Sequence, residues 1–286
     1  MLVNWLKRSF YIILFLAVFN TLEHVCHKIT DGFTLSRIQF DAKDTRPANP
    51  DPATFAMLDQ PYHYFNCGHQ CFAFISNDGH YILKFFKYTR HTPPAWTAHI
   101  PLLNRFKSLR PERIKKITWK KNRDFQGYQL AFDRFREQTG ILSLHLNPTS
   151  SGYPTITLYD KLKIRHTLDL NTAPFVLQIK ASPTYPTFSS WLEAGDYDKV
   201  RSGISRIIAL CAERLHLQIL DEDVHLYCNF GFVGETPIQI DPGRFSMSPS
   251  PISPEKLTPF VKELQEWFAQ HYPPLAPYVE ACANSY

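Results

Sequence analysis

Short hydrophobic runs dominate the region from residue 62 to residue 180 and predict β-strands. Phe72–Ile75 and Tyr81–Phe86 are the clearest of these runs, and both are rich in aromatic residues. The sequence Asn77-Asp78-Gly79 between them is a strong turn signal, so we expect the two runs to pair as a hairpin. Other strand-like runs are Tyr64–Phe65, Ile141–Leu146, Thr155–Tyr159 and Phe175–Lys180.

Three segments show the 3.6-residue period of amphipathic helices. One spans Leu102 to Gly140, is rich in Lys and Arg, and predicts one long helix or two consecutive helices that end at a glycine, which is a common helix stop. Its cations form a basic face that either meets solvent or contacts acidic lipid. A second, near the C-terminus, carries Phe260, Leu264, Trp267 and Phe268. The third segment has the clearest apolar stripe, whose residues are 4, 3, 1, 3 and 4 positions apart. They are Val200, Ile204, Ile207, Ile208, Cys211 and Leu215.

This order of elements predicts an α+β fold with two lobes rather than an alternating βαβ sheet. We expect a β-rich N-terminal lobe at residues 58–180, with a long helical insertion, and a helical C-terminal lobe at residues 181–286. Residues 26–57 are predicted to be a linker, because Asp41 to Pro52 is polar and rich in proline.

Residues 1–25 have the pattern of a signal anchor or transmembrane helix. Lys7 and Arg8 precede an uncharged apolar run of 10 residues from Phe10 to Phe19, or 13 if it continues to Leu22, against the roughly 20 of a comfortable span. No small-x-small cleavage site follows, so we expect an uncleaved, single-pass membrane anchor; the alternative is an amphipathic or buried helix. The positive flank would keep the N-terminus cytoplasmic and send the remainder across the membrane.

Composition excludes some classes of protein but does not indicate a ligand. The chain has 286 residues, enough for about two domains, and 44% hydrophobic residues, which excludes a wholly disordered chain. A net charge of +5 over this length is too small to indicate a nucleic-acid partner. Six cysteines without a C-x-x-C pair do not make a disulfide scaffold, although Cys67 and Cys71 would be able to pair locally in an exported body.

The candidate chemistry lies after the clearest helix. Asp223 is followed six residues later by Asn229 and, twelve residues beyond, by Asp241. Two short strands between Asn229 and Asp241 predict a hairpin, which would return both ends to one place. Carboxylate and amide oxygens are ligands that Mg²⁺ takes when it also holds phosphates, and a second carboxylate nearby can accept a hydroxyl proton.

At this point the sequence resembles the protein-kinase-like superfamily. Asp223, Asn229 and the triplet Asp241-Pro242-Gly243 match the catalytic loop and metal-binding triplet in order and approximate spacing. Lys84 matches the strand lysine, and Gly68 lies where the glycine-rich loop is expected. The resemblance implies ATP as nucleotide, Mg²⁺ held by Asn229 and Asp241, phosphates held by Gly68 and Lys84, and Asp223 as catalytic base.

The departures from this pattern leave alternatives open. The loop has a single glycine, and the catalytic loop lacks the usual His-Arg, so Asp221 competes with Asp223 as the base. Asp133 and Glu137 are equal candidates for the acid that pairs with Lys84. The alternative function is a catalytically inactive, pseudokinase-type scaffold that binds a protein partner at the membrane. A zinc site at Cys67 and Cys71 is set aside, because no second Cys or His pair stands at a suitable distance.

Overall fold

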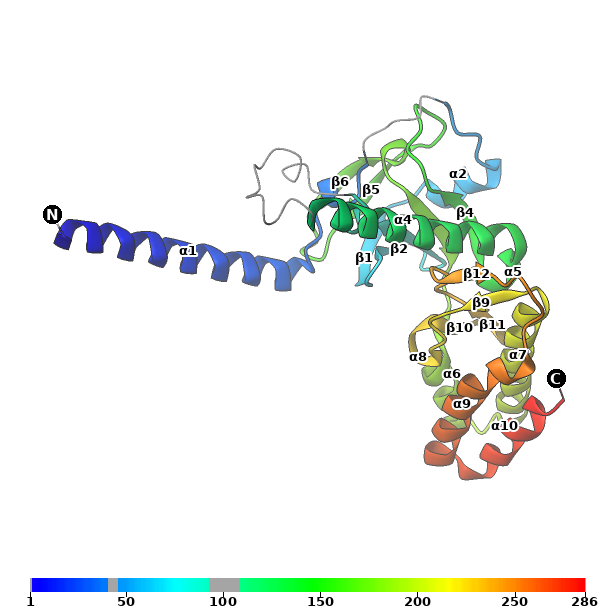
Figure 1. Ribbon diagram of the computed structural model, residues 1–286. Coiled ribbons are helices and arrows are strands. Elements are labelled where there is room, and N and C mark those ends of the chain that lie inside the picture. Colours follow the sequence, from blue (N-terminus) through cyan, green and yellow to red (C-terminus); the bar gives the residue numbers. More distant parts are fainter. Residues whose placement is uncertain (1, 41–45, 93–108, 286) are drawn as a thin grey trace.

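The computed structural model describes residues 2–40, 46–92 and 109–285, and it confirms the α+β class. A curled β-sheet forms the N-terminal part, helices form most of the C-terminal part, and an apolar helix precedes both (Figure 1). Residues 41–45 of the predicted linker and residues 102–108 of the predicted long helix lie outside the described residues.

Seven strands make the N-terminal sheet, in the order β4-β7-β3-β2-β1-β5-β6. Neighbours are antiparallel except β1 and β5, which are parallel. The predicted hairpin is confirmed, because β2 pairs with β3 across a turn in which Gly79 has a φ of 77°. The strands are β1 Tyr62–Cys67, β2 Cys71–Ser76, β3 Tyr81–Phe86, β4 Ile141–His145, β5 Thr155–Tyr159, β6 Arg165–Asp169 and β7 Phe175–Ile179.

Strand β6 was not expected, since Leu168 is its one apolar residue and the one that is buried. The segment predicted as a linker also holds more structure than its composition indicates. It contains the 3₁₀ helix η1 (Leu35–Arg37) and the helix α2 (Pro52–Leu58). Phe33 and Ile38 are buried in one hydrophobic cluster with the sheet, where the Phe33 ring packs against Phe72 and Phe74.

The predicted long helix forms α4 (Leu109–Arg134) and the short α5 (Arg136–Thr139), and α5 ends at Gly140 as expected, with a φ of 64°. A four-residue helix, α3 (Tyr88–His91), follows β3 and packs against α4. The buried face of α4, which includes Phe125 and Tyr128, lies against the sheet in one hydrophobic cluster with Phe86 of β3. The same cluster continues into the C-terminal helices, so α4 belongs to the cores of both parts.

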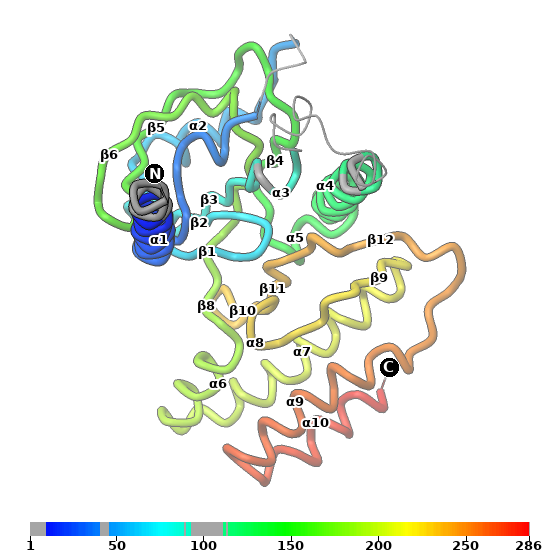
Figure 2. Tube along the Cα trace, turned by 60° about the vertical axis from the view of Figure 1, so that its left-hand side comes forward, coloured from blue at the N-terminus to red at the C-terminus, as the bar shows by residue number. Residues whose placement is uncertain are grey.

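The C-terminal part is built around α7, whose predicted stripe is fully confirmed because all six of its residues are buried. Two small sheets, β11-β10-β8 and β12-β9, lie where this part meets the N-terminal sheet (Figure 2). The elements are β8 Ser182–Pro183, α6 Thr184–Glu193, α7 Tyr197–His216, β9 Ile219–Asp221, α8 Leu226–Asn229, β10 Phe230–Val233, β11 Thr236–Gln239, β12 Phe245–Met247, η5 Pro254–Leu257, α9 Thr258–His271, η6 Pro273–Leu275 and α10 Ala276–Ala283.

The N-terminal helix α1 (Leu2–Thr30) projects away from the rest of the protein (Figure 1). It continues past the apolar run identified in the sequence, and its segment Phe10–Thr30 is 21 residues long and apolar enough to cross a membrane. This result rests on length and composition alone, and a signal sequence near an N-terminus would meet the same criteria. The side chains from Phe10 to Ile29 are all exposed, so α1 is not a buried core helix.

Candidate functional site

A cavity of about 370 Å³ lies between the N-terminal sheet and the C-terminal part. Its walls come from the β1–β2 loop, β3, the β7–β8 connection, α4, α8 and the segment after β11. Five of the six residues predicted for the site line it: Gly68, Lys84, Asp223, Asn229 and Asp241. The sixth, Asp221, does not line the cavity.

Lys84 reaches the cavity from the middle of β3. The strand pairs with β2 and β7 on either side, which fixes its register and directs the Lys84 side chain toward the C-terminal part. Its Nζ donates a hydrogen bond to the carbonyl oxygen of Ile240, the residue before Asp241. Burial lowers the pKa of Lys84, and the nearby Asp241 carboxylate acts in the opposite direction.

Neither acid proposed as the partner of Lys84 pairs with it. Asp133 instead accepts a hydrogen bond from Gln129 on the exposed surface of α4, and Glu137 is exposed on α5. The α4 residue that lines the cavity is Tyr128. Helical periodicity explains the difference, because Asp133 and Tyr128 lie on different faces of α4.

The loop between β1 and β2 is held by a lysine that the sequence did not single out. The Gly68 N–H donates to the Cys71 carbonyl oxygen at 3.0 Å, which closes the loop. Lys87 Nζ donates to the Gly68 carbonyl oxygen at 2.6 Å and lies 3.0 Å from Cys67 Sγ. Lys87 therefore fixes the loop and adds a positive charge beside it. Cys67 and Cys71 are both free, so the local disulfide considered from the sequence is wrong.

Asp223 and Asn229 are joined through the backbone of the loop. Asn229 Nδ2 donates to the Asp223 carbonyl oxygen, which leaves Asn229 Oδ1 available for another ligand. The Asp223 carboxylate remains about one third exposed and forms ion pairs with His225 Nε2 at 3.5 Å and Arg244 Nε at 3.4 Å. Asp223 is thus solvent-accessible, with the His225 imidazole and the Arg244 guanidinium group beside it.

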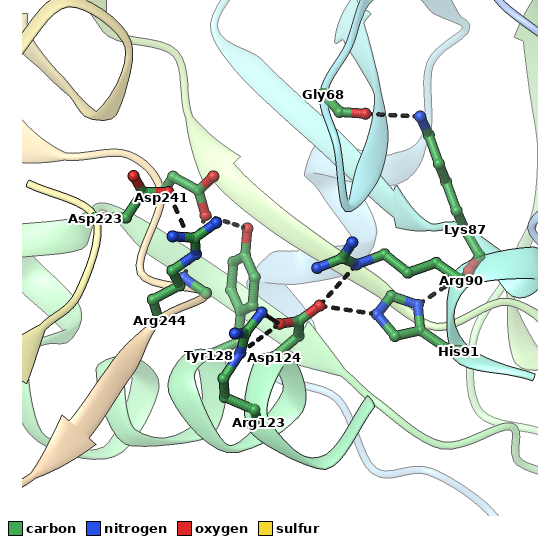
Figure 3. Close-up of polar contacts among 11 residues, drawn as sticks. Gly68, Lys87, Arg90, His91, Arg123, Asp124, Tyr128, Asp223, Asp241 and Arg244 are labelled. Carbon is green, nitrogen blue, oxygen red and sulfur yellow. Dashed lines mark hydrogen bonds and ion pairs between the residues drawn. The ribbon is translucent and has the colours of Figure 1, made fainter. Parts of the chain in front are cut away.

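The hairpin of β10 and β11 brings Asn229 next to Asp241, as its spacing predicts. Phe230 pairs with Gln239, and the Ile240 N–H donates to the Asn229 carbonyl oxygen at 2.8 Å. Asp241 Oδ1 accepts hydrogen bonds from the Tyr128 hydroxyl at 3.1 Å and from the Gly243 N–H at 3.2 Å (Figure 3). These bonds fix the orientation of the carboxylate.

Two glycines allow α4 and the loop to approach the 241–243 triplet closely. A Cβ on Gly127 would lie 2.6 Å from the Pro242 carbonyl oxygen, so no other residue fits there without a shift. A Cβ on Gly243 would lie 2.2 Å from Gln70 Oε1. Gln70 Oε1 is buried without a hydrogen-bond partner. The triplet is thus packed between α4 and the β1–β2 loop.

Asp221 has the environment of a structural residue. Its side chain is fully buried and forms an ion pair with Arg214 Nη1 of α7 at 3.1 Å. Gln239 Nε2 and the Asp223 N–H also donate to its carboxylate. Burial raises the pKa of Asp221, and the Arg214 charge offsets this only partly. With its oxygens already bonded, Asp221 is poorly placed to accept a proton from a ligand.

The donor atoms at Asn229 and Asp241 fit a magnesium ion that is held partly by phosphates. Asn229 Oδ1 is free, and Asp241 Oδ2 accepts no hydrogen bond from any residue that the structure describes. Among the described residues, no three His, Cys, Asp or Glu side chains form a metal-binding group. This set matches Mg²⁺, which usually takes one or two protein oxygens and completes its coordination with water and substrate phosphates.

Comparisons with known proteins give only a distant relation. No protein-family model and no curated protein matches the chain. Three solved structures of WbdD, described as a bifunctional kinase-methyltransferase, are similar to it. One is 14% identical with a TM-score of 0.36 and covers 69% of this chain and 34% of WbdD. The others, one with a bound kinase inhibitor and one at 2.2 Å, are 14% and 15% identical, have TM-scores of 0.35 and cover 72% and 71% of this chain. The chain spans about a third of WbdD, and similarity at this level carries no argument about the site.

Proposed function

We propose that this chain is an ATP- and magnesium-dependent phosphotransferase that α1 anchors to a membrane. One observation carries the proposal. Lys84, Asp223, Asn229 and Asp241 come from segments up to 157 residues apart, yet they line one cavity, with their free oxygens and their buried ammonium group together. Such a combination of a phosphate-binding cation, two metal ligands and a second carboxylate suits phosphoryl transfer.

Each residue has a separate role in this proposal. Lys84, which is buried and held by the Ile240 carbonyl oxygen, binds the phosphates of ATP. Asn229 and Asp241 would hold Mg²⁺, which neutralises phosphate charge when bound. Asp223 orients the acceptor hydroxyl and takes its proton as the oxygen forms a bond to the terminal phosphorus. The bond between that phosphorus and the bridging oxygen breaks, and ADP leaves.

Nucleotide binding is the direct test. We expect titration calorimetry on the full chain in detergent to detect MgATP, and the Lys84→Ala variant to bind at least tenfold more weakly, because a charge-assisted hydrogen bond is lost. The matched control is Lys262→Ala. Lys262 is an exposed lysine on α9, remote from the cavity. Equal affinity in the wild type and the Lys84→Ala variant would reject the nucleotide site.

Membrane anchoring has its own test. Phe15 and Leu16 are exposed on α1, in the middle of the uncharged apolar run from Phe10 to Phe19. We expect the full chain to stay with membranes during alkaline carbonate extraction and the double variant Phe15→Arg, Leu16→Arg to be released, because charges near the bilayer centre are costly. Release of the wild-type chain would contradict the anchor.

A scaffold without catalysis is the second candidate, and the environment of Lys84 favours it. Within the described residues, no acidic side chain pairs with Lys84, and its partner is a backbone carbonyl oxygen. Arg244 also pairs with the carboxylate proposed as the base. A chain that binds MgATP but releases no ADP during prolonged incubation would fit this candidate and not the phosphotransferase.

A further inference from the structure

A group of cations lies beside the cavity on the α3 and α4 side. At its centre is Asp124 of α4, whose side chain is fully buried. The carboxylate accepts hydrogen bonds from Arg90 Nε at 2.9 Å, from Arg123 Nη2 at 2.8 Å and, at 3.1 Å, from His91 Nε2 (Figure 3). One carboxylate thus faces two guanidinium groups, and most of its bonding capacity serves to hold them in place.

Helical geometry places this group next to the proposed metal site. Asp124 and Tyr128 are four residues apart on α4, so they lie on one face about one turn, roughly 5.4 Å, from each other. Tyr128 bonds to Asp241, and Asp124 bonds to Arg90. Figure 3 shows the Arg90 guanidinium group extending from α3 toward the side on which Tyr128 and Asp241 lie. Arg90 and a proposed magnesium ligand are therefore bonded to two side chains that lie one turn apart on α4.

Further cations gather at the edge of the cavity. His69 lines the cavity in the loop after Gly68. The Arg90 charge, burial and the charges of Lys120 and Lys87 lower the pKa of His69, and the Asp124 carboxylate acts in the opposite direction. The local potential is therefore positive, and an anion at this position would be attracted. We call Lys87, Arg90 and Lys120 the cation cluster.

Arg90 has free donors in a fixed position. Its side chain is only about 10% exposed, and its Nε is committed to Asp124. Neither Nη1 nor Nη2 donates to any residue in the described part of the chain. A guanidinium group with one nitrogen anchored and two nitrogens open is pre-organised for the oxygens of a phosphate group.

We infer that the cation cluster binds a phosphate group of a ligand at the proposed site, with Arg90 as its main donor. This inference rests on the proposed function and adds a residue to it. The phosphate comes from one of two sources: the terminal phosphate of ATP or a phosphate carried by the acceptor. In both cases the cluster supplies positive charge beside the phosphate group. The β1–β2 loop, which has a single glycine, does not supply it.

The test separates the two sources with the full chain in detergent. MgATP and MgADP affinities are measured first for the wild type and Arg90→Gln. If the cluster holds the terminal phosphate, Arg90→Gln weakens MgATP by about tenfold and leaves MgADP unchanged. Inorganic phosphate is then titrated in the presence of saturating MgADP. If the cluster holds an acceptor phosphate, Arg90→Gln weakens this binding by about tenfold, and MgATP affinity does not change.

Arg123→Gln is the matched control. Arg123 donates to the same buried carboxylate but stacks on the exposed ring of Trp119, and it is not among the cations that act on His69. Arg123→Gln therefore removes a guanidinium group bonded to Asp124, as Arg90→Gln does. Lys120→Gln, which removes a cluster cation without touching Asp124, is used if Arg90→Gln does not fold. We expect both cluster variants to lose phosphate affinity and Arg123→Gln to retain it.

The failures of the two proposals are distinguishable. Equal losses in Arg90→Gln and Arg123→Gln, or no loss in either titration, would overturn the cation cluster even when MgATP binds through Lys84. If the wild type binds inorganic phosphate through Arg90 but no MgATP, the phosphotransferase proposal fails and the phosphate site stands. If the wild type binds neither ligand, both proposals fail.

Discussion

The end of β9 and the loop that follows it carry acids two residues apart, but they place them in opposite environments. Asp221 is fully buried, and its oxygens accept bonds from Arg214 and Gln239. Asp223 is about one third exposed, lines the cavity and pairs with cations that solvent can reach. The same side chain thus stabilises the fold in one position and is chemically available in the other. The burial of each carboxylate and its bonding partners determine its role, because both residues are aspartates.

The largest expected effect separates the two acids by turnover. Asp223→Asn should lower the rate of ADP release by about 100-fold or more, because a general base contributes 10² to 10⁴. The melting temperature and MgATP affinity should not change, since Asp223 makes only weak ion pairs. The rate is measured with a coupled ADP assay on the full chain, with water as the acceptor. An unchanged rate would remove Asp223 from the base role.

The next effect falls on stability. Asp221→Ala should lower the free energy of unfolding by about 3 kcal/mol, because it leaves the buried Arg214 and Gln239 side chains without the oxygens that accept their hydrogen bonds. Urea unfolding measures this loss. At a temperature where the variant is folded, its MgATP affinity should equal that of the wild type. A stable Asp221→Ala variant that has lost turnover would reverse the two assignments.

A smaller effect is expected at the contact between α4 and the 241–243 triplet. Tyr128→Phe removes the hydroxyl that donates to Asp241 and keeps the buried ring. We expect the magnesium affinity of the ATP complex to fall by about fivefold, since one hydrogen bond contributes roughly 1 kcal/mol. Tyr185→Phe is the control, because that hydroxyl donates to Glu263, remote from the cavity lining. Equal effects of the two variants would show that Tyr128 does not orient Asp241.

The smallest effect concerns pH and compares Asp221 with Asp124. Burial raises the pKa of Asp221 above its ordinary 3.8, so protonation stabilises the fold as pH falls from this raised value toward 3.8. Burial would also raise the pKa of Asp124, but hydrogen bonds from His91, Arg123 and Arg90 outweigh it and lower the pKa. Ionised Asp124 therefore stabilises the fold above pH 3.8, and this contribution is lost as pH falls below 3.8 through the lowered pKa.

Unfolding of the wild type, Asp221→Asn and Asp124→Asn in urea between about pH 3 and pH 6 measures both contributions. The stability of the wild type relative to Asp221→Asn should rise as pH falls toward 3.8. The stability of the wild type relative to Asp124→Asn should decrease as pH falls below 3.8. Changes of the same sign in both comparisons would contradict this account of the two buried acids.

Local signals in the sequence were enough to predict much of the fold and part of the candidate site. The turn at residues 77–79 and the apolar stripe of α7 are encoded by near neighbours. The β10–β11 hairpin is also local, and it brings Asn229 beside Asp241. Strand register then carries Lys84 to the same place.

The remaining parts depend on packing between distant segments. Tyr128 reaches Asp241 because Gly127 lets α4 approach Pro242, 115 residues further along the chain. No pattern near Asp221 shows that Arg214 would neutralise it. Phe33 and Ile38 lie just before the polar, proline-rich stretch from Asp41 to Pro52, and only the sheet that they cover explains why they are buried.

Magnesium dependence of ATP binding tests the central claim most directly. ATP affinity is measured by calorimetry on the full chain, with and without Mg²⁺, for the wild type and Asp241→Asn. We expect Mg²⁺ to strengthen ATP binding to the wild type and to have little effect on Asp241→Asn, with both proteins equally stable. The same magnesium enhancement in both proteins, or no ATP binding by the wild type at millimolar ATP, would contradict the proposed site.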